Sequence, residues 1–151
     1  MNDRVVVSVN ISEQKGTRKH PLQGPVTITM LGMQGDAHAG DWHRQLSLLA
    51  QESIDKMQGH GLVLHPGDFA ENITTQGLDL LTLPIGTRLK IGNAVTMEVT
   101  QIGKECHLGC EIRKLVGDCV MPREGIFTRV ITPGTIEAGD IISIISKGGT
   151  P

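Results

Sequence analysis

Residues 88–99, Arg88-Leu89-Lys90-Ile91-Gly92-Asn93-Ala94-Val95-Thr96-Met97-Glu98-Val99, have the pattern of two β-strands joined by a tight turn. Apolar and polar side chains alternate on both sides of Gly92-Asn93, a dipeptide that favours a two-residue hairpin turn. A period of two residues sends successive side chains to opposite faces of a sheet. The segment therefore predicts an antiparallel β-hairpin.

The same alternation recurs along the chain. Strand-like runs occupy residues 5–9, 26–30, 46–49, 127–131 and 141–145. One short helix is predicted over residues 51–58, where Ile54 and Met57 share a face, and a second after Cys110. Nineteen glycines suit a fold with many tight turns. Many short strands and few helices predict a mainly β (α+β) fold in the form of a closed or partly closed β-barrel.

Length and composition limit the function classes. The 151 residues predict one domain, residues 1–151, with a core from about residue 5 to 146 and a frayed tail at 147–151. A net charge of -2 and only three aromatic residues argue against nucleic-acid binding. No apolar run is long enough to span a bilayer, and no signal peptide is visible. We therefore expect a cytoplasmic protein without nucleic-acid or membrane partners.

All three cysteines lie in one region, Cys106 and Cys110 within Gly103-Lys104-Glu105-Cys106-His107-Leu108-Gly109-Cys110 and Cys119 shortly after it. A thiol acts as nucleophile or metal ligand only as thiolate, which nearby basic side chains favour. An odd cysteine count in a reducing compartment favours catalysis or metal binding over a disulfide. For Cys119, in the apolar run with Val120 and Met121, core packing is an equal alternative.

A structural zinc site is the competing interpretation of this cluster. Three residues separate Cys106 from Cys110, which fits a zinc-ligand pair. Cys119 stands alone, and the fourth ligand would be His107 or a distant His38 or His43. The chain would then be a zinc-stabilised structural or interaction domain.

Two other stretches have a high density of polar side chains. Gly35-Asp36-Ala37-His38-Ala39-Gly40-Asp41-Trp42-His43-Arg44-Gln45 is either a functional loop or a solvated one, because surface loops rich in Gly and Asp often contain such patterns. The second is Pro66-Gly67-Asp68-Phe69-Ala70-Glu71-Asn72-Ile73-Thr74-Thr75-Gln76-Gly77. If this segment is a strand, Asn72 and Thr74 share one face. Asn72 then either hydrogen-bonds a polar ligand or satisfies backbone groups.

Four ordered motifs resemble those of stand-alone MOSC domain proteins, a family named after the C-terminal domain of molybdenum cofactor sulfurases. The resemblance extends from about Val7 through Ile145 and includes the terminal Gly134-Thr135-Ile136-Glu137-Ala138-Gly139-Asp140. The motifs are Gly35–Gln45, Pro66–Asn72, Gly103–Cys110 and Gly117-Asp118-Cys119-Val120-Met121-Pro122-Arg123-Glu124-Gly125-Ile126-Phe127-Thr128-Arg129-Val130.

This resemblance implies a β-barrel-like fold that binds the molybdenum cofactor (molybdopterin) and handles sulfur. It implies that Cys110 is the working thiol, either as a persulfide carrier or as a molybdenum ligand, with Cys106 as a second catalytic thiol. It also places Asn72 and Arg129 near the cofactor. The chain has no pyridoxal-phosphate motif, so a separate cysteine desulfurase would donate sulfur and a molybdoenzyme would accept it. A non-catalytic cofactor-delivery module is the alternative.

Molybdopterin carries a phosphate and a polar pterin, so its pocket needs cations and hydrogen-bonding groups. We expect the Gly35–Gln45 loop to border that pocket and to position His38, His43 or Arg44. The candidates for the positive charge are Lys15, Arg18, Lys19, Arg44, Arg123 and Arg129.

Overall fold

The computed structural model of the protein describes residues 4–15, 17–57, 63–103 and 124–147. Its described residues form strands, one α-helix and one 3-10 turn. In chain order these are β1 (Val5–Ile11), β2 (His20–Pro21), β3 (Val26–Thr29), β4 (Gly32–Met33), β5 (Leu46–Ala50), α1 (Gln51–Lys56), β6 (Ile73–Gln76), η1 (Leu80–Thr82), β7 (Arg88–Ile91), β8 (Val95–Ile102), β9 (Ile126–Thr132), β10 (Gly134–Ile136) and β11 (Ile142–Ser146).

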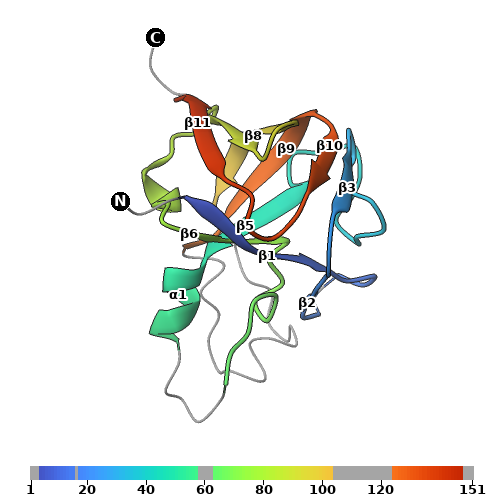
Figure 1. The fold of residues 1–151 in the computed structure, drawn as a ribbon, viewed down its shortest axis with the longest axis vertical. Helices are drawn as coiled ribbons and strands as arrows, with labels where there is room; N and C mark the ends of the chain where they lie inside the picture. The colour runs from blue at the N-terminus through green and yellow to red at the C-terminus, as the bar shows by residue number, and fades with distance from the viewer. Residues whose placement is uncertain (1–3, 16, 58–62, 104–123, 148–151) are drawn as a thin grey trace.

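Eight strands form a curved sheet in the order β11-β7-β8-β9-β5-β6-β1-β2, and three form a small sheet in the order β10-β3-β4 (Figure 1). The pair β5–β6 is parallel, whereas the other strand pairs in the described chain are antiparallel. The mainly β fold and most of the predicted strand positions are therefore confirmed.

The two sheets are not closed into a barrel within the described chain. Strands β1 and β11 approach each other, but an isolated bridge between Val5 and Ile141 joins them in place of a ladder. Two backbone hydrogen bonds support this seam, from Val6 N to the Asp140 carbonyl (2.9 Å) and from Ile142 N to the Arg4 carbonyl (2.8 Å). Of the two forms that the sequence predicted, a closed or a partly closed barrel, the described chain does not have the closed one, because the pairing stops at the start of β11.

The predicted hairpin is present as β7 and β8, but its connection is longer than a two-residue turn. Ile91 pairs with Val95, so three residues connect the strands. Gly92 has a φ of +64°, and a Cβ there would lie 2.9 Å from Asp140 Oδ2. The left-handed backbone therefore favours glycine, and a Cβ at this position would displace the Asp140 carboxylate.

The main core lies between the two sheets, where buried side chains from β1, β3, β5, β7, β8, β9, β10 and β11 meet. A smaller cluster packs beneath α1 and consists of Leu49, Ile54, Met57, Leu64, Phe69 and Phe127. The helix begins at the predicted residue, and its last residue, Lys56, is followed by Met57 as the C-cap. The segment after Cys110, where a second helix was predicted, lies outside the described residues.

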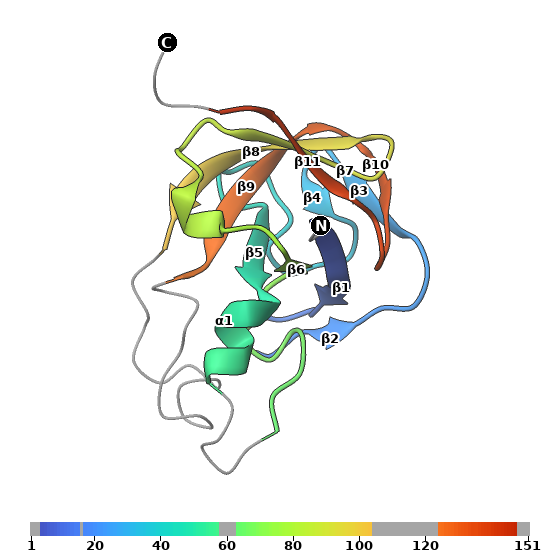
Figure 2. The same cartoon turned by 60° about the vertical axis from the view of Figure 1, so that its left-hand side comes forward.

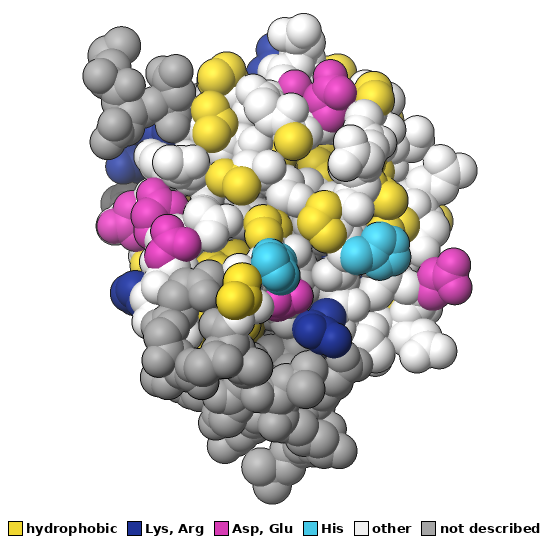
Figure 3. All heavy atoms as spheres, turned by 60° about the horizontal axis from the view of Figure 1, so that its bottom comes forward, with side chains coloured by type: hydrophobic (Ala, Val, Ile, Leu, Met, Phe, Trp, Pro, Cys, Tyr) yellow, Lys and Arg dark blue, Asp and Glu magenta, His cyan; other side chains and the backbone are white. Residues whose placement is uncertain are grey.

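The lower ends of β8 and β9 lie on the same side of the molecule as α1 (Figure 2). The connection between these two strands carries the three cysteines, and a hydrogen bond from Gly103 N to the Gly125 carbonyl (2.8 Å) joins its described ends. The surface on the α1 side shows acidic, basic and histidine side chains intermixed (Figure 3). No helix in the described ranges is long and apolar enough to cross a membrane.

Candidate functional site

The Gly35–Gln45 loop is anchored to the small sheet and to β9 by its last side chain. Buried Gln45 donates from Nε2 to the carbonyls of Gly40 (2.8 Å) and Met30 (3.0 Å), and its Oε1 accepts from Val130 N (2.8 Å). Three hydrogen bonds to one amide give the loop a defined position, as a chain without regular secondary structure requires.

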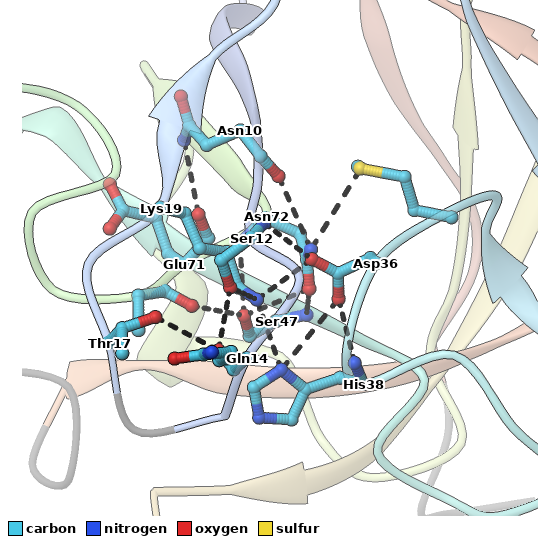
Figure 4. A network of polar contacts seen from close by, with 12 residues as sticks. Asn10, Ser12, Gln14, Thr17, Lys19, Asp36, His38, Ser47, Glu71 and Asn72 are labelled. Atoms are coloured by element: carbon cyan, nitrogen blue, oxygen red, sulfur yellow. Dashed lines mark hydrogen bonds and ion pairs between the residues drawn. The ribbon is translucent and has the colours of Figure 1, made fainter.

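The start of the loop is held by a buried ion pair between Asp36 and Lys19. Lys19 Nζ lies 2.9 Å from Asp36 Oδ1, and both side chains have 0% exposure (Figure 4). The carboxylate also accepts from Ser12 N (3.1 Å) and His38 N (3.0 Å). Burial alone raises the pKa of Asp36, but hydrogen bonds from His38 and Lys19 and the charge of Lys19 outweigh burial, so the pKa lies well below its usual range.

Lys19 also contacts the ring of His38. Its Nζ lies 3.0 Å from His38 Nδ1, and an ammonium has donors only. A neutral His38 ring that accepts this hydrogen bond at Nδ1 carries its proton on Nε2. The ring lies parallel to that of Trp42, with centroids 6.4 Å apart, and Trp42 Nε1 donates to the His38 carbonyl (2.7 Å).

Trp42 is surrounded by cationic groups. Lys15 Nζ lies 4.7 Å from the Trp42 ring centroid, and Arg44 Cζ lies 4.8 Å from it. The same guanidinium carbon lies 5.4 Å from the Phe127 ring. Arg44 Nε is buried and has no hydrogen-bond partner among the described residues. The loop thus presents a cation and an aromatic platform together.

The loop also contacts the start of the cysteine-bearing connection. His43 Nε2 lies 2.9 Å from Gln101 Oε1, and Gln101 Nε2 donates to the Gly103 carbonyl (2.8 Å). Thr100 Oγ1 donates to the His43 carbonyl. Because Gly103 immediately precedes the cysteine-bearing connection, these contacts place His43 beside the point where that connection begins.

The other end of the connection is tied to α1. Glu124 accepts from Ser53 Oγ (2.6 Å) and pairs with Lys56 Nζ (2.7 Å). An open groove of about 560 Å³ lies here between α1 and residues 77–81, and Glu124 is among its lining residues. This contact holds the start of β9 beside the helix.

Asn72 is fully buried and hydrogen-bonds within the protein. Its Oδ1 accepts from Ser47 N (3.0 Å) and Ser47 Oγ (3.3 Å), and its Nδ2 donates to the Asn10 carbonyl (3.4 Å). The amide thus joins β5 and β1 ahead of β6. Of the two roles considered for Asn72, these contacts are those of a side chain that satisfies backbone groups.

Glu71, the residue before Asn72, is a buried carboxyl without a cationic partner in the described chain. Its Oε2 accepts from Gly67 N (2.9 Å) and Thr74 Oγ1 (2.7 Å), whereas Oε1 is buried without a partner. Burial raises the pKa of Glu71 to about 7, and the two hydrogen bonds offset part of that effect.

Arg129 lies on the exposed face of β9. Its Nη2 is 3.3 Å from Glu98 Oε2, and the same carboxylate lies 3.3 Å from Arg88 Nε through Oε1. The described contacts of Arg129 are therefore to Glu98, not to the Gly35–Gln45 loop. Cys106, Cys110, Cys119, His107 and Arg123 lie outside the described residues. Within the described ranges, no group of three or more His, Cys, Asp or Glu side chains is placed to hold a metal ion.

The sequence arguments overlooked Trp42, Asp36 and Gln101 as members of this site. Trp42 could have been identified from the sequence, since a tryptophan between charged residues in a polar loop is unusual for core packing. Asp36 and Gln101 act through partners remote in sequence, so local pattern could not single them out.

Comparison with known families places this site in context. The MOSC domain family matches residues 34–143, and the chain belongs to that family. MOSC domains are associated with the molybdenum cofactor. The matched region includes the Gly35–Gln45 loop, the Pro66–Asn72 motif and the whole cysteine-bearing connection. A comparison with curated proteins finds no match.

Solved structures share the fold. The YUAD protein from Bacillus subtilis superimposes with a TM-score of 0.76 at 18% identity, covering 93% of this chain and 94% of that one. YiiM from Geobacillus stearothermophilus has a TM-score of 0.72 at 21% identity, covering 95% and 75%. YiiM from Escherichia coli has a TM-score of 0.68 at 20% identity, covering 97% and 72%. At these identities the likeness shows the fold.

Proposed function

We propose that this protein binds the molybdenum cofactor and carries sulfane sulfur as a persulfide on Cys110. One observation carries the proposal: the hydrogen bonds from His43 to Gln101 and from Gln101 to Gly103 bring the Gly35–Gln45 loop to the start of the cysteine-bearing connection. Two motifs that are far apart in the sequence thereby border one region of the surface.

The described residues suit an anionic, partly aromatic ligand. Arg44 has a buried Nε without a partner, and Lys15 and Arg44 both lie over Trp42. Molybdopterin combines a phosphate with a flat pterin, which cationic and aromatic side chains recognise. When bound, the cofactor supplies the molybdenum atom that receives sulfur. Cys110 and Cys106 are the thiols proposed beside it, and His38, His43, Arg123, Arg129 and Asn72 remain candidates for its environment.

The sulfur-loading step requires a thiolate and a donor persulfide. The Cys110 thiolate attacks the terminal sulfur of a persulfide on a partner cysteine desulfurase. The new sulfur–sulfur bond forms as the donor bond breaks, and the donor cysteine leaves as thiolate. The exchange needs no outside oxidant. A molybdoenzyme is the proposed final acceptor.

Persulfide loading tests this function directly. The protein is incubated with a cysteine desulfurase and cysteine, and its peptides are analysed by mass spectrometry. We expect persulfide on Cys110, its loss in Cys110→Ser and its retention in Cys119→Ser. Alkylation at neutral pH should label Cys110 first and Cys119 last, because Val120 and Met121 give Cys119 an apolar sequence environment.

Other outcomes would contradict the proposal. Persulfide that forms on Cys106 alone, or that persists in Cys110→Ser, would exclude Cys110 as the carrier. Molybdenum-cofactor binding without sulfur loading would support the delivery module. Stoichiometric zinc in protein produced without molybdenum cofactor would support the zinc-stabilised domain, since a structural zinc remains bound through purification.

A further inference from the structure

We propose that Lys15, Trp42 and Arg44 form a phosphate-binding subsite. This proposal rests on the proposed function in one respect: in that function, the subsite would receive the phosphate of the pterin cofactor. The two cationic groups lie 4.7 Å and 4.8 Å from the same indole ring. They come from segments separated by the whole of β2, β3 and β4, so the fold brings both to the same ring.

Lys15 and Arg44 differ from four other basic residues in the described chain, each of which pairs with a carboxylate. Lys19 pairs with Asp36, Lys56 with Glu124, and both Arg88 and Arg129 with Glu98. In the ranges that the structure describes, neither Lys15 nor Arg44 has an ion pair or a hydrogen bond from its cationic group. Positive charge that no carboxylate compensates attracts an anion.

Arg44 is also restrained by its contacts with two aromatic rings. Its guanidinium lies over the rings of Trp42 and Phe127, and its Nε is withdrawn from solvent without a partner. A stacked guanidinium has fewer accessible rotamers, so less conformational entropy is lost on binding. Its neighbour Gln45 is hydrogen-bonded to three backbone groups, which fixes the chain that carries Arg44.

Phosphate fits this pair better than a carboxylate does. The planar fork of arginine binds two oxygens of one phosphate, and a lysine ammonium acts as a point charge on a third. A dianion matches the two formal positive charges of Lys15 and Arg44. Lys15 is exposed, so it can swing to a ligand, whereas the aromatic rings restrain Arg44.

Trp42 gives a direct readout, because it is the single tryptophan and the protein has no tyrosine. The test is a titration of the intact protein with inorganic phosphate at constant ionic strength, followed by tryptophan fluorescence. We expect a saturable change that sodium chloride does not reproduce. Arg44→Gln and Lys15→Gln should each weaken the apparent affinity roughly tenfold or more, and Arg44→Lys should show intermediate affinity.

Arg88→Gln is the matched control, because it removes from β7 an arginine that is paired with Glu98. It should bind phosphate as the wild type does. Wild-type affinity in both Arg44→Gln and Lys15→Gln would overturn the proposal, and so would a chloride titration that matches the phosphate titration. If Arg44→Gln does not fold, Lys15→Gln decides alone, since Lys15 is exposed.

Equilibrium dialysis then identifies the source of the phosphate. The arms are a pterin monophosphate, the same pterin after phosphatase treatment, and inorganic phosphate. Tighter binding of the phosphorylated pterin than of the other two supports a cofactor subsite, whereas equal binding of both phosphates limits the subsite to free phosphate. Phosphate binding by a wild-type protein that a cysteine desulfurase does not load with persulfide would retain the subsite and reject the sulfur role. The reverse pattern would reject the subsite alone.

Discussion

At the scale of single residues, the unusual feature is how many polar side chains are buried on and around β1 and β6. Asn10, Asp36, Glu71, Asn72 and Thr74 are all withdrawn from solvent, and hydrogen bonds link most of their polar atoms to each other or to backbone groups. Buried polar groups are tolerated only when they are hydrogen-bonded. Two of these groups, Glu71 and Asp36, therefore lead to separate predictions about the stability of the fold.

Glu71 should make the protein less stable as the pH rises from about 4.5 to 7. Its pKa in the folded state is about 7, above the ordinary 4.5, so the protonated form stabilises the fold fully below pH 4.5, and this contribution is lost as the pH rises through 7. The loss amounts to about 3 kcal/mol, because one pKa unit corresponds to about 1.4 kcal/mol.

Glu71→Gln keeps a neutral side chain of the same shape, so this pH dependence should disappear and the variant should exceed wild type in stability at pH 8. Urea unfolding at several pH values measures the effect, with the exposed Glu13→Gln as the matched control. A Glu71→Gln variant with the same pH profile as wild type would show that the carboxyl stays ionised in the fold.

Breaking the buried ion pair between Lys19 and Asp36 should lower the free energy of unfolding more than breaking a surface ion pair does. Lys19→Met leaves the carboxylate uncompensated, and Asp36→Leu does the same to the ammonium, so each should lower the free energy of unfolding by about 3–5 kcal/mol. The double variant should be much less destabilised than the sum of the two.

Lys56→Met is the control for that cycle, since Lys56 is 62% exposed and its pair with Glu124 should contribute less than about 1 kcal/mol. Chemical unfolding of the wild type, the two single variants and the double variant gives the free energies of the double-mutant cycle. Additive losses would mean that Lys19 and Asp36 do not interact in the folded protein.

At the scale of elements, the turn before β6 depends on one glycine. Gly67 has a φ of +92°, and a Cβ there would lie 2.3 Å from the Lys19 carbonyl oxygen. Its N–H donates to Glu71, and its carbonyl accepts from Lys19 N (2.8 Å). The turn thus fastens the start of β6 to the segment that carries Lys19.

Gly67→Ala should therefore destabilise the protein far more than Gly24→Ala. Gly24 also has a positive φ (+75°), but a Cβ there meets no atom within 4 Å. The cost at Gly24 is backbone strain alone, about 1–2 kcal/mol, whereas Gly67→Ala adds a clash with backbone. Thermal unfolding of both variants measures the difference, and equal losses would exclude the clash as a cause.

At the scale of the whole molecule, the curved sheet nearly meets itself at the seam between β1 and the start of β11. Strand edges with unpaired backbone groups tend to pair with other chains. Here the hydrogen bonds of Val6 N and Ile142 N occupy part of the edge that a closed barrel would remove. The seam thus protects the edge without a continuous ladder.

If the seam persists in solution, the amides of Val6 and Ile142 should exchange with solvent as slowly as that of Val99, which donates to the Thr87 carbonyl in the middle of the sheet (2.8 Å). Native-state hydrogen exchange followed by NMR gives the rates. Exchange of Val6 and Ile142 at the rate of exposed loop amides would mean that the seam opens independently of the rest of the sheet.

The sequence alone determined the features that depend on the local order of residues. Alternation of side chains predicted β7, β9 and β11 within one residue, because a half-buried strand needs one apolar face. It predicted the start of β8 within one residue but ended that strand three residues early. Helix α1 was predicted from its apolar spacing, and the ordered motifs indicated the family. The Gly35–Gln45 loop was recognised as a candidate site from its density of polar side chains and from its resemblance to a motif of the family.

Only the tertiary structure decided which of the candidate cations are available. The sequence does not distinguish Lys15, Lys19, Arg44 and Arg129 from one another. In the structure, Asp36 neutralises Lys19 and Glu98 neutralises Arg129, whereas Lys15 and Arg44 each lie against the Trp42 ring. Charge pairing and burial depend on distances between atoms that are remote along the chain, and local patterns contain no such distances. The closure of the sheet and the pKa of Glu71 depend on tertiary contacts for the same reason.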